Sequence, residues 1–186
     1  MQHEDGGIPY GIESAAHPVS GEVSWLESLP VFVFRPDPWS SFIYAGIAAK
    51  VARLLQETEP GKAGSYQESA LKALAFGLSE KQKLESQAGW QNLSKGRKQS
   101  VEDEKIYAVT ECYHLTNDKK WHELIKNSGC FEKAPEQSST TLLDAAFTYA
   151  NMDDSLTTEE LRAKAREAVI QKANVMLAML RANAFN

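Results

Sequence analysis

The sequence predicts an all-α fold of antiparallel helical hairpins, preceded by a long irregular N-terminal arm. From Pro38 onward, apolar residues recur at helical spacing almost without interruption, and polar turns separate the periodic segments. Residues 1–36 are instead rich in glycine and proline, and only the run "VFVF" at 31–34 looks extended. We therefore divide the chain into an arm, 1–36, and a helical domain, 37–186.

The first half of the domain contains three expected helices. The first, 38–56, has Asp37 as its N-cap and is apolar on nearly every side, so we expect it to be buried. The second, 63–78, is amphipathic. The polar stretch 79–99 should prolong that helix in its first half and form an exposed loop in the rest. The third helix should begin near Ser100, where "SVED" resembles a capping box, and end before Asn117.

The second half contains three more expected helices. A short helix, 119–126, follows a turn of two or three residues, which is a length that folds helices back antiparallel. The alanine-rich helix 140–151 and the helix 158–182, which starts with the capping box "TTEE", complete the chain. Because apolar helices alternate with amphipathic ones, we expect inner helices covered by outer ones.

Composition excludes several classes of protein. A chain of 186 residues with 42% apolar residues is long enough to bury one core. With 20 basic against 25 acidic residues and one basic cluster, "KGRK" at 95–98, a nucleic-acid partner is not expected. No apolar run approaches the roughly 18 to 20 residues of a membrane span. The first residues do not resemble a secretory signal, so any such signal of a secreted or periplasmic parent protein is expected upstream.

Cysteines and histidines predict no metal or cofactor. Cys112 and Cys130 have no metal-ligand spacing, and they are either a disulfide or two unrelated core thiols. His114 and His122 are eight residues apart, and "HELIK" lacks the second histidine of a zinc-binding helix. No EF-hand pattern for calcium is present either.

Three segments in succession resemble glycoside hydrolase family 9. They are "VFVFRPDPWSSFIYAGIAAKVARLL", "YQESALKALAF" and "DEKIYAVTECYHLTNDKKW", and the last follows a family pattern of the form DExxW almost position by position. The resemblance implies an (α/α)6 toroid, of which this chain, from Val31 onward, would be the central portion. It also implies a parent enzyme, endoglucanase-like, that hydrolyses β-linked glucan or amino-sugar oligosaccharides.

The resemblance does not extend to catalysis. The family's aspartates lie in a "DAGDY"-like string and its acid follows a "WGSN"-like string, and neither occurs here. The family is inverting, which requires two carboxyl groups about 6.5 to 9.5 Å apart. Asp103 and Glu104 are sequence neighbours, point about 100° apart on a helix, and are interpreted as acids that favour a helix start. No catalytic residue is assigned, and this chain alone is expected to be inactive.

Aromatic residues are the candidate sugar contacts, because pyranose C–H faces pack on aromatic rings. Tyr107 occupies the position of the tryptophan in the DExxW pattern, so it either contacts a sugar or is a core tyrosine. The change to tyrosine indicates a ligand other than plain cellulose. Trp25 in the arm either lines the cleft rim or anchors the arm. Trp39 and Trp121 are expected to be packing residues.

Two functions remain open at this point. One is a portion of a glycoside hydrolase that supplies barrel wall and part of a sugar cleft. The other is a noncatalytic helical interaction or scaffold module, which the missing acid and base strings favour. Because a partial ring would expose apolar helix faces, self-association is also expected.

Overall fold

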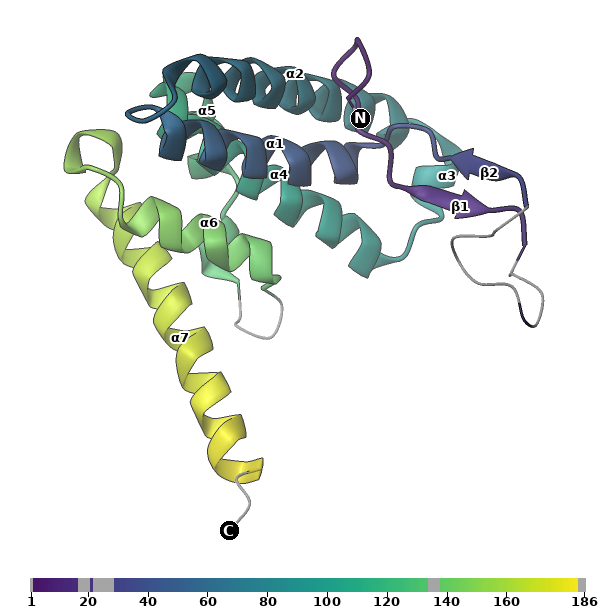
Figure 1. The fold of residues 1–186 in the computed structure, drawn as a ribbon. Coiled ribbons are helices and arrows are strands. Elements are labelled where there is room, and N and C mark those ends of the chain that lie inside the picture. The colour runs from purple at the N-terminus through teal and green to yellow at the C-terminus, as the bar shows by residue number, and fades with distance from the viewer. Residues whose placement is uncertain (1, 17–20, 22–28, 134–137, 184–186) are drawn as a thin grey trace.

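The fold is all-α, as predicted, with a small two-stranded sheet in the arm (Figure 1). The computed structural model describes residues 2–16, 21, 29–133 and 138–183. Its α-helices are α1 (Pro38–Leu55), α2 (Pro60–Glu85), α3 (Ala88–Gln91), α4 (Lys95–Thr116), α5 (Lys119–Asn127), α6 (Thr140–Ala150) and α7 (Glu159–Asn183). Two 3-10 turns, η2 (Cys130–Glu132) and η4 (Asp154–Leu156), flank α6 in the sequence.

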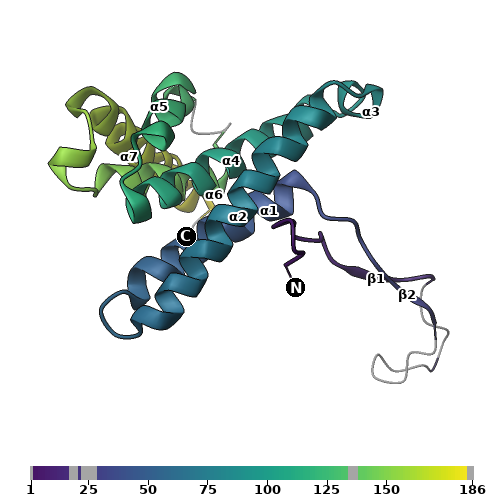
Figure 2. The ribbon, with the colours of Figure 1, turned by 90° about the horizontal axis from the view of Figure 1, so that it is seen from above.

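The three helices α1, α4 and α6 lie side by side and run in the same direction. Trp39 at the start of α1 binds Ser100 of α4, and Arg53 near its end binds Glu111 of α4, so the pairing advances in the same direction along both helices. Thr141 and Thr148 of α6 likewise bind Glu104 and Glu111 of α4. A row of parallel helices requires return segments, and α2 and α5 supply them (Figure 2).

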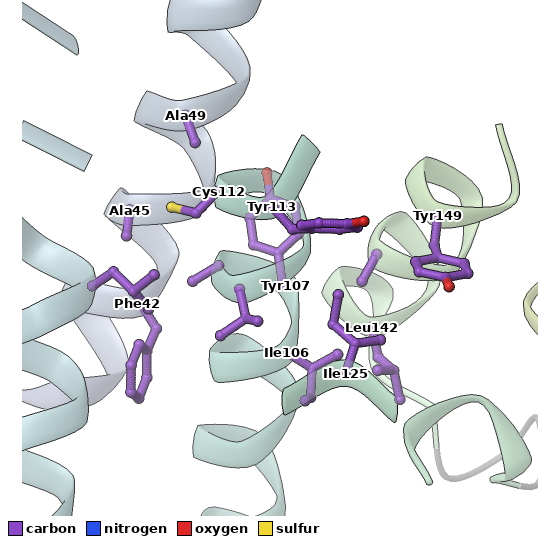
Figure 3. Close-up of a cluster of buried hydrophobic side chains, with 14 of the residues drawn as sticks. Phe42, Ala45, Ala49, Ile106, Tyr107, Cys112, Tyr113, Ile125, Leu142 and Tyr149 are labelled. Atoms are coloured by element: carbon purple, nitrogen blue, oxygen red, sulfur yellow. The ribbon is translucent and has the colours of Figure 1, made fainter. Parts of the chain in front are cut away.

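The core lies between this row and the helices that cover it. Figure 3 shows Phe42, Ala45 and Ala49 of α1 on one side of α4, and Leu142 and Tyr149 of α6 on the other. α2 packs on α1, α5 packs on α4 and α7 packs on α6. The expected alternation of inner and outer helices is therefore confirmed.

The arm contains the antiparallel hairpin of β1 (Ile12–Ser14) and β2 (Val31–Val33), in which Ile12 is opposite Val33. The extended conformation predicted for the "VFVF" run is confirmed at β2. No pattern in the sequence predicts β1, because a three-residue strand with one large apolar residue has no measurable alternation.

The start predicted for the third helix was wrong. Ser94, not Ser100, is the N-cap: its side chain accepts a hydrogen bond from the backbone N–H of Arg97 at 3.2 Å. Ser100 lies inside α4, where its hydroxyl accepts from the indole of Trp39 at 3.0 Å. Most of the expected loop is helical, as α3 and the first turn of α4, although the stretch is largely exposed as predicted. The continuation of α2 to Glu85 is also as predicted.

Both cysteines are free and buried in the core, so the core-thiol alternative is the correct one. Burial raises the pKa of the Cys112 thiol to about 12. Within the described residues, no helix combines the length and apolarity needed to cross a membrane.

Candidate functional site

A row of polar side chains follows one face of α4, between α1 and α6. Glu104, Tyr107, Glu111 and His114 are spaced by three, four and three residues, which places them on one side of a helix. Because α1 and α6 pack against α4 on either side, these four residues are buried or half-buried. We call them the α4 polar row.

Glu111 is the most enclosed member of the α4 polar row, since its side chain is 0% exposed. Its Oε2 accepts from Nη2 of Arg53 at 3.0 Å, and its Oε1 accepts from the hydroxyl of Thr148 at 2.7 Å. Lys50 places its Nζ 3.8 Å from Oε1. This carboxylate therefore joins α1, α4 and α6, and both its oxygens are occupied.

Glu104 has one occupied oxygen and one without a partner. Its Oε1 accepts from the hydroxyl of Thr141 at 2.9 Å, while Oε2 is buried and has no hydrogen-bond partner among the described residues. Burial raises the pKa of this carboxyl, against the opposing effect of the Thr141 hydrogen bond, and the charge of Asp103 raises it further. Glu104 thus holds its proton to a higher pH than an exposed glutamate does.

Asp103 lies outside the α4 polar row and has other partners. This is expected, because adjacent residues on a helix point about 100° apart. Its Oδ1 accepts from Lys133 Nζ and from Gln99 Nε2, both at 2.6 Å. The interpretation of Asp103 and Glu104 as acids at a helix start was wrong, because α4 begins at Lys95, about two turns earlier. Their carboxyl groups are held by side chains rather than by the helix terminus.

Tyr107 lies at the centre of the row and is only 4% exposed (Figure 3). Its ring packs so closely on Gly46 of α1 that a Cβ there would lie 2.3 Å from the ring. Burial first, and then the nearby carboxylate of Glu111, raise the pKa of the phenol, so the hydroxyl keeps its proton. Tyr107 can therefore donate a hydrogen bond, and its contact with a sugar stays a prediction.

The predictions for the three tryptophans Trp25, Trp39 and Trp121 have different outcomes. Trp25 lies outside the described residues, so its place at a cleft rim stays a prediction. Trp39 and Trp121 are half-buried and pack against the core, which confirms the interpretation of both as packing residues. The ring of Trp39 also contacts the ring of Tyr10 in the arm, at 5.8 Å between centroids.

An aromatic stack that sequence reasoning missed connects α4, α5 and α6. The imidazole of His122 lies between the rings of Tyr113 and Tyr149, with centroids 5.0 and 5.9 Å away and planes within 12° and 15°. His122 Nε2 and the Tyr149 hydroxyl form a hydrogen bond of 2.8 Å. In the described part of the chain, no cluster of three or more histidine, cysteine or acidic residues could hold a metal ion.

Acid should destabilise the protein through this stack. Burial and the charge of Lys126 lower the pKa of His122, so the unfolded chain binds its proton more readily than the folded chain does. The stability that neutral His122 contributes is therefore present above pH about 6.5 and is lost as the pH falls below that value. Burial lowers the pKa of His114 as well, with the same sign.

The measurement is the thermal unfolding midpoint between pH 5 and 8 for the wild type, His122→Gln and the double variant with His114→Gln. We expect the midpoint to fall towards low pH in the wild type and to fall less steeply in each variant. An unchanged slope in the double variant would contradict the assignment.

The similarity of this chain to known proteins lies in its fold. No family model matches the sequence, and no curated protein matches it. Among solved structures, GH family 9 endoglucanase J30 matches with a TM-score of 0.73 and 22% identity over 98% of this chain. The chain has a GH9-like fold. The Zn-binding triple mutant of the same endoglucanase gives a TM-score of 0.73 and 21% identity, again over 98% of this chain.

The GH9-like fold confirms the resemblance that the three sequence segments indicated. The chain spans about a third of the solved structures that it matches, since it covers 34% of each. The likeness at this level of identity concerns the fold. Which reaction the residues serve is a separate question.

Sequence reasoning also missed the role of Glu111. Glu104 and Glu111 are seven residues apart, with Tyr107 between them, which is the spacing of one helix face. Two acids on the same helix face as an aromatic residue are a signal that could have pointed to a polar row.

Proposed function

We propose that this chain supplies part of the barrel wall and part of the sugar cleft of an endoglucanase-like glycoside hydrolase. The observation that carries the proposal is the match to endoglucanase J30 over 98% of the chain at a TM-score of 0.73. The proposed substrate is a β-linked glucan or an amino-sugar oligosaccharide, hydrolysed with inversion. The acid and base belong to other parts of the protein.

The arrangement of the helices supports the proposal that this chain forms part of a toroid. An (α/α)6 ring needs parallel inner helices, each followed by an outer return helix, and α1, α4 and α6 with α2, α5 and α7 have this alternation. In the proposal, residues 37–186 form the partial barrel and residues 1–36 form an arm beside it.

The side chains of the α4 polar row support a cleft wall better than a catalytic pair. Glu111 is fully buried, and Arg53 and Thr148 occupy its oxygens, so it cannot reach a glycosidic bond or a water molecule. Glu104 is 6% exposed and binds Thr141. Inversion requires two carboxyl groups that face a sugar from opposite sides, and the proposal assigns that role to neither.

Tyr107 and Trp25 are the proposed sugar contacts. Tyr107 keeps its phenolic proton, which suits a hydrogen bond to a sugar hydroxyl, and its ring is fixed against Gly46. In the longer protein, Tyr107→Phe should raise the KM for an oligosaccharide by about tenfold, the loss expected for one hydrogen bond of roughly 1.4 kcal/mol. An unchanged KM would make Tyr107 a core residue only.

Hydrolysis by the product of the longest open reading frame that contains this chain tests the proposed function. Proton NMR of the products should show the α-anomer first, since an inverting enzyme converts a β-linkage to an α-product. First appearance of the β-anomer would overturn the inverting mechanism. Absence of any hydrolysis would favour the noncatalytic helical module, which the missing acid and base strings support.

Self-association is a further part of the proposal. The C-terminal half of α7 extends away from the other helices (Figure 1). Along α7, the large apolar side chains of Ile170, Met176, Leu177 and Leu180 are exposed. Contiguous exposed apolar side chains favour association. Light scattering should therefore give a mass above 20.6 kDa that falls when Met176 and Leu180 are both changed to Ser. A monodisperse monomer would contradict this expectation.

A further inference from the structure

A pocket that lies away from the α4 polar row is formed between the arm and α2. Its volume is about 610 Å³, which is within the range of small-molecule sites. The residues of its lining that matter for binding are Asp5 and Arg35 of the arm and Phe76, Ser79, Glu80 and Lys83 of α2. Neither proposed sugar contact belongs to this lining.

Two glycines fix the wall that the arm contributes. Gly6 has φ +95°, and a Cβ there would lie 2.4 Å from the carbonyl oxygen of Lys72. A Cβ on Gly7 would lie 2.7 Å from Pro36 and 2.8 Å from the ring of Phe76. The amide of Gly7 also donates to the carboxylate of Asp5 at 2.9 Å. The arm can approach α2 this closely only with glycine at both positions.

The hydrogen bonds of Gln2 hold the arm in place. Its side-chain amide donates to the carbonyl oxygen of Ser69 at 3.0 Å and accepts from the Ser69 hydroxyl at 2.6 Å. These bonds join the start of the arm to the middle of α2. The pocket is therefore formed by residues that the fold holds together before any ligand arrives.

The charges in the pocket are mixed and nearly balanced. Glu80 is 8% exposed, and its two oxygens accept from Arg35 at 3.3 Å and from Lys83 at 3.4 Å. Both cations are mostly exposed beyond those contacts, at 85% and 65%. They retain N–H groups for a ligand, but Glu80 and Asp5 offset their charge, so a simple anion gains little net attraction here.

Phe76 supplies the apolar surface of the pocket. Its side chain is half-buried on α2, beside Pro36. An aromatic ring next to both donors and acceptors matches a ligand with an apolar face and an edge of hydroxyl groups. A sugar ring has this combination, because its C–H groups pack on aromatic faces and its hydroxyls both donate and accept.

We propose that the pocket between the arm and α2 binds a neutral oligosaccharide, as a second sugar site separate from the cleft. The polyhydroxylated class follows from the pocket, whereas the choice of β-linked glucose units rests on the proposed function. Phe76 contacts the sugar ring, Arg35 and Lys83 donate to its hydroxyls, and Asp5 accepts from them.

The test is an NMR titration of the isotopically labelled chain with cellotetraose. Wild type should show saturable shifts of the amides of Phe76 and Ser79. Ser79→Trp fills the pocket from an exposed position on α2 and should abolish those shifts. Ser65→Trp makes the same change at an exposed position of α2 outside the pocket and should leave the affinity unchanged.

A double variant tests the two proposed hydrogen-bond donors, Arg35 and Lys83. Arg35→Ala with Lys83→Ala should weaken cellotetraose binding at least about tenfold, the loss expected for charge-assisted hydrogen bonds. Circular dichroism checks that each variant is folded. Equal affinity in Ser79→Trp, absence of saturable shifts in the wild type, or a response of these amides to inorganic phosphate instead of cellotetraose would overturn the proposal.

The outcome separates this inference from the proposed function. Hydrolysis of β-glucan by the longer protein without cellotetraose binding at the pocket overturns the second site alone. Binding at the pocket without hydrolysis by the longer protein supports the second site and contradicts the proposed enzyme.

Discussion

Replacing Glu111 with alanine is expected to lower the free energy of unfolding by roughly 3 to 5 kcal/mol. Glu111 is fully buried, and its carboxylate is the shared partner of Arg53 on α1 and Thr148 on α6. Without it, the guanidinium of Arg53, which is only 25% exposed, loses its counter-charge. Urea unfolding followed by circular dichroism measures the change.

Two controls distinguish the effect of leaving Arg53 without its counter-charge from the effect of removing any glutamate side chain. Glu123→Ala removes a glutamate that is 58% exposed on α5, and it should change the free energy of unfolding by no more than about 0.5 kcal/mol. The double variant Glu111→Leu with Arg53→Met replaces the pair with apolar groups and should recover much of the loss. Similar values for Glu111→Ala and Glu123→Ala would show that the buried carboxylate does not join the three helices.

Replacing Gly46 with leucine is expected to destabilise the protein by roughly 3 kcal/mol. A Cβ at Gly46 would lie 2.3 Å from the ring of Tyr107, so α1 and α4 would have to separate or the tyrosine would have to leave its position. The change therefore affects both the packing of the parallel row and the proposed sugar contact. Thermal and urea unfolding measure its size.

Gly64→Leu is the matched control for Gly46→Leu. Gly64 is also inside a helix, α2, but a Cβ there meets nothing within 4 Å. Since glycine is a poor helix former, this substitution should stabilise the protein by up to about 1 kcal/mol. The two substitutions should therefore have opposite signs. A loss of stability in both would mean that the close approach of Gly46 to Tyr107 does not determine the result.

The sequence predicted the helices well because the helical domain has strong apolar periodicity. The predicted end of the first helix, Gln56, is one residue from the observed end at Leu55. The predicted end of the short helix is also one residue from the observed end of α5 at Asn127. The start of α4 was missed because "SVED" matches a capping box, whereas the real cap at Ser94 precedes polar residues with no periodic pattern.

The polar contacts between helices could not be predicted to the same degree. Glu111 is an ordinary acid in the sequence, and its burial depends on Arg53 and Thr148, which lie 58 and 37 residues away. The aromatic stack on His122 likewise requires three helices to meet. The pocket between the arm and α2 depends on glycines whose partners are far along the chain. Only the tertiary structure brings such groups together.

In the proposed function, this chain is a structural part of a glycoside hydrolase and carries no acid or base of its own. The most direct test is the release of reducing ends from a panel of β-glucan and chito-oligosaccharides, by this 186-residue chain and by the product of the longest open reading frame that contains it. We expect activity in the longer protein alone. Activity of the chain by itself would contradict the absence of an acid and a base from it. If neither protein hydrolyses any substrate, the proposed enzyme is contradicted and the helical interaction module is favoured.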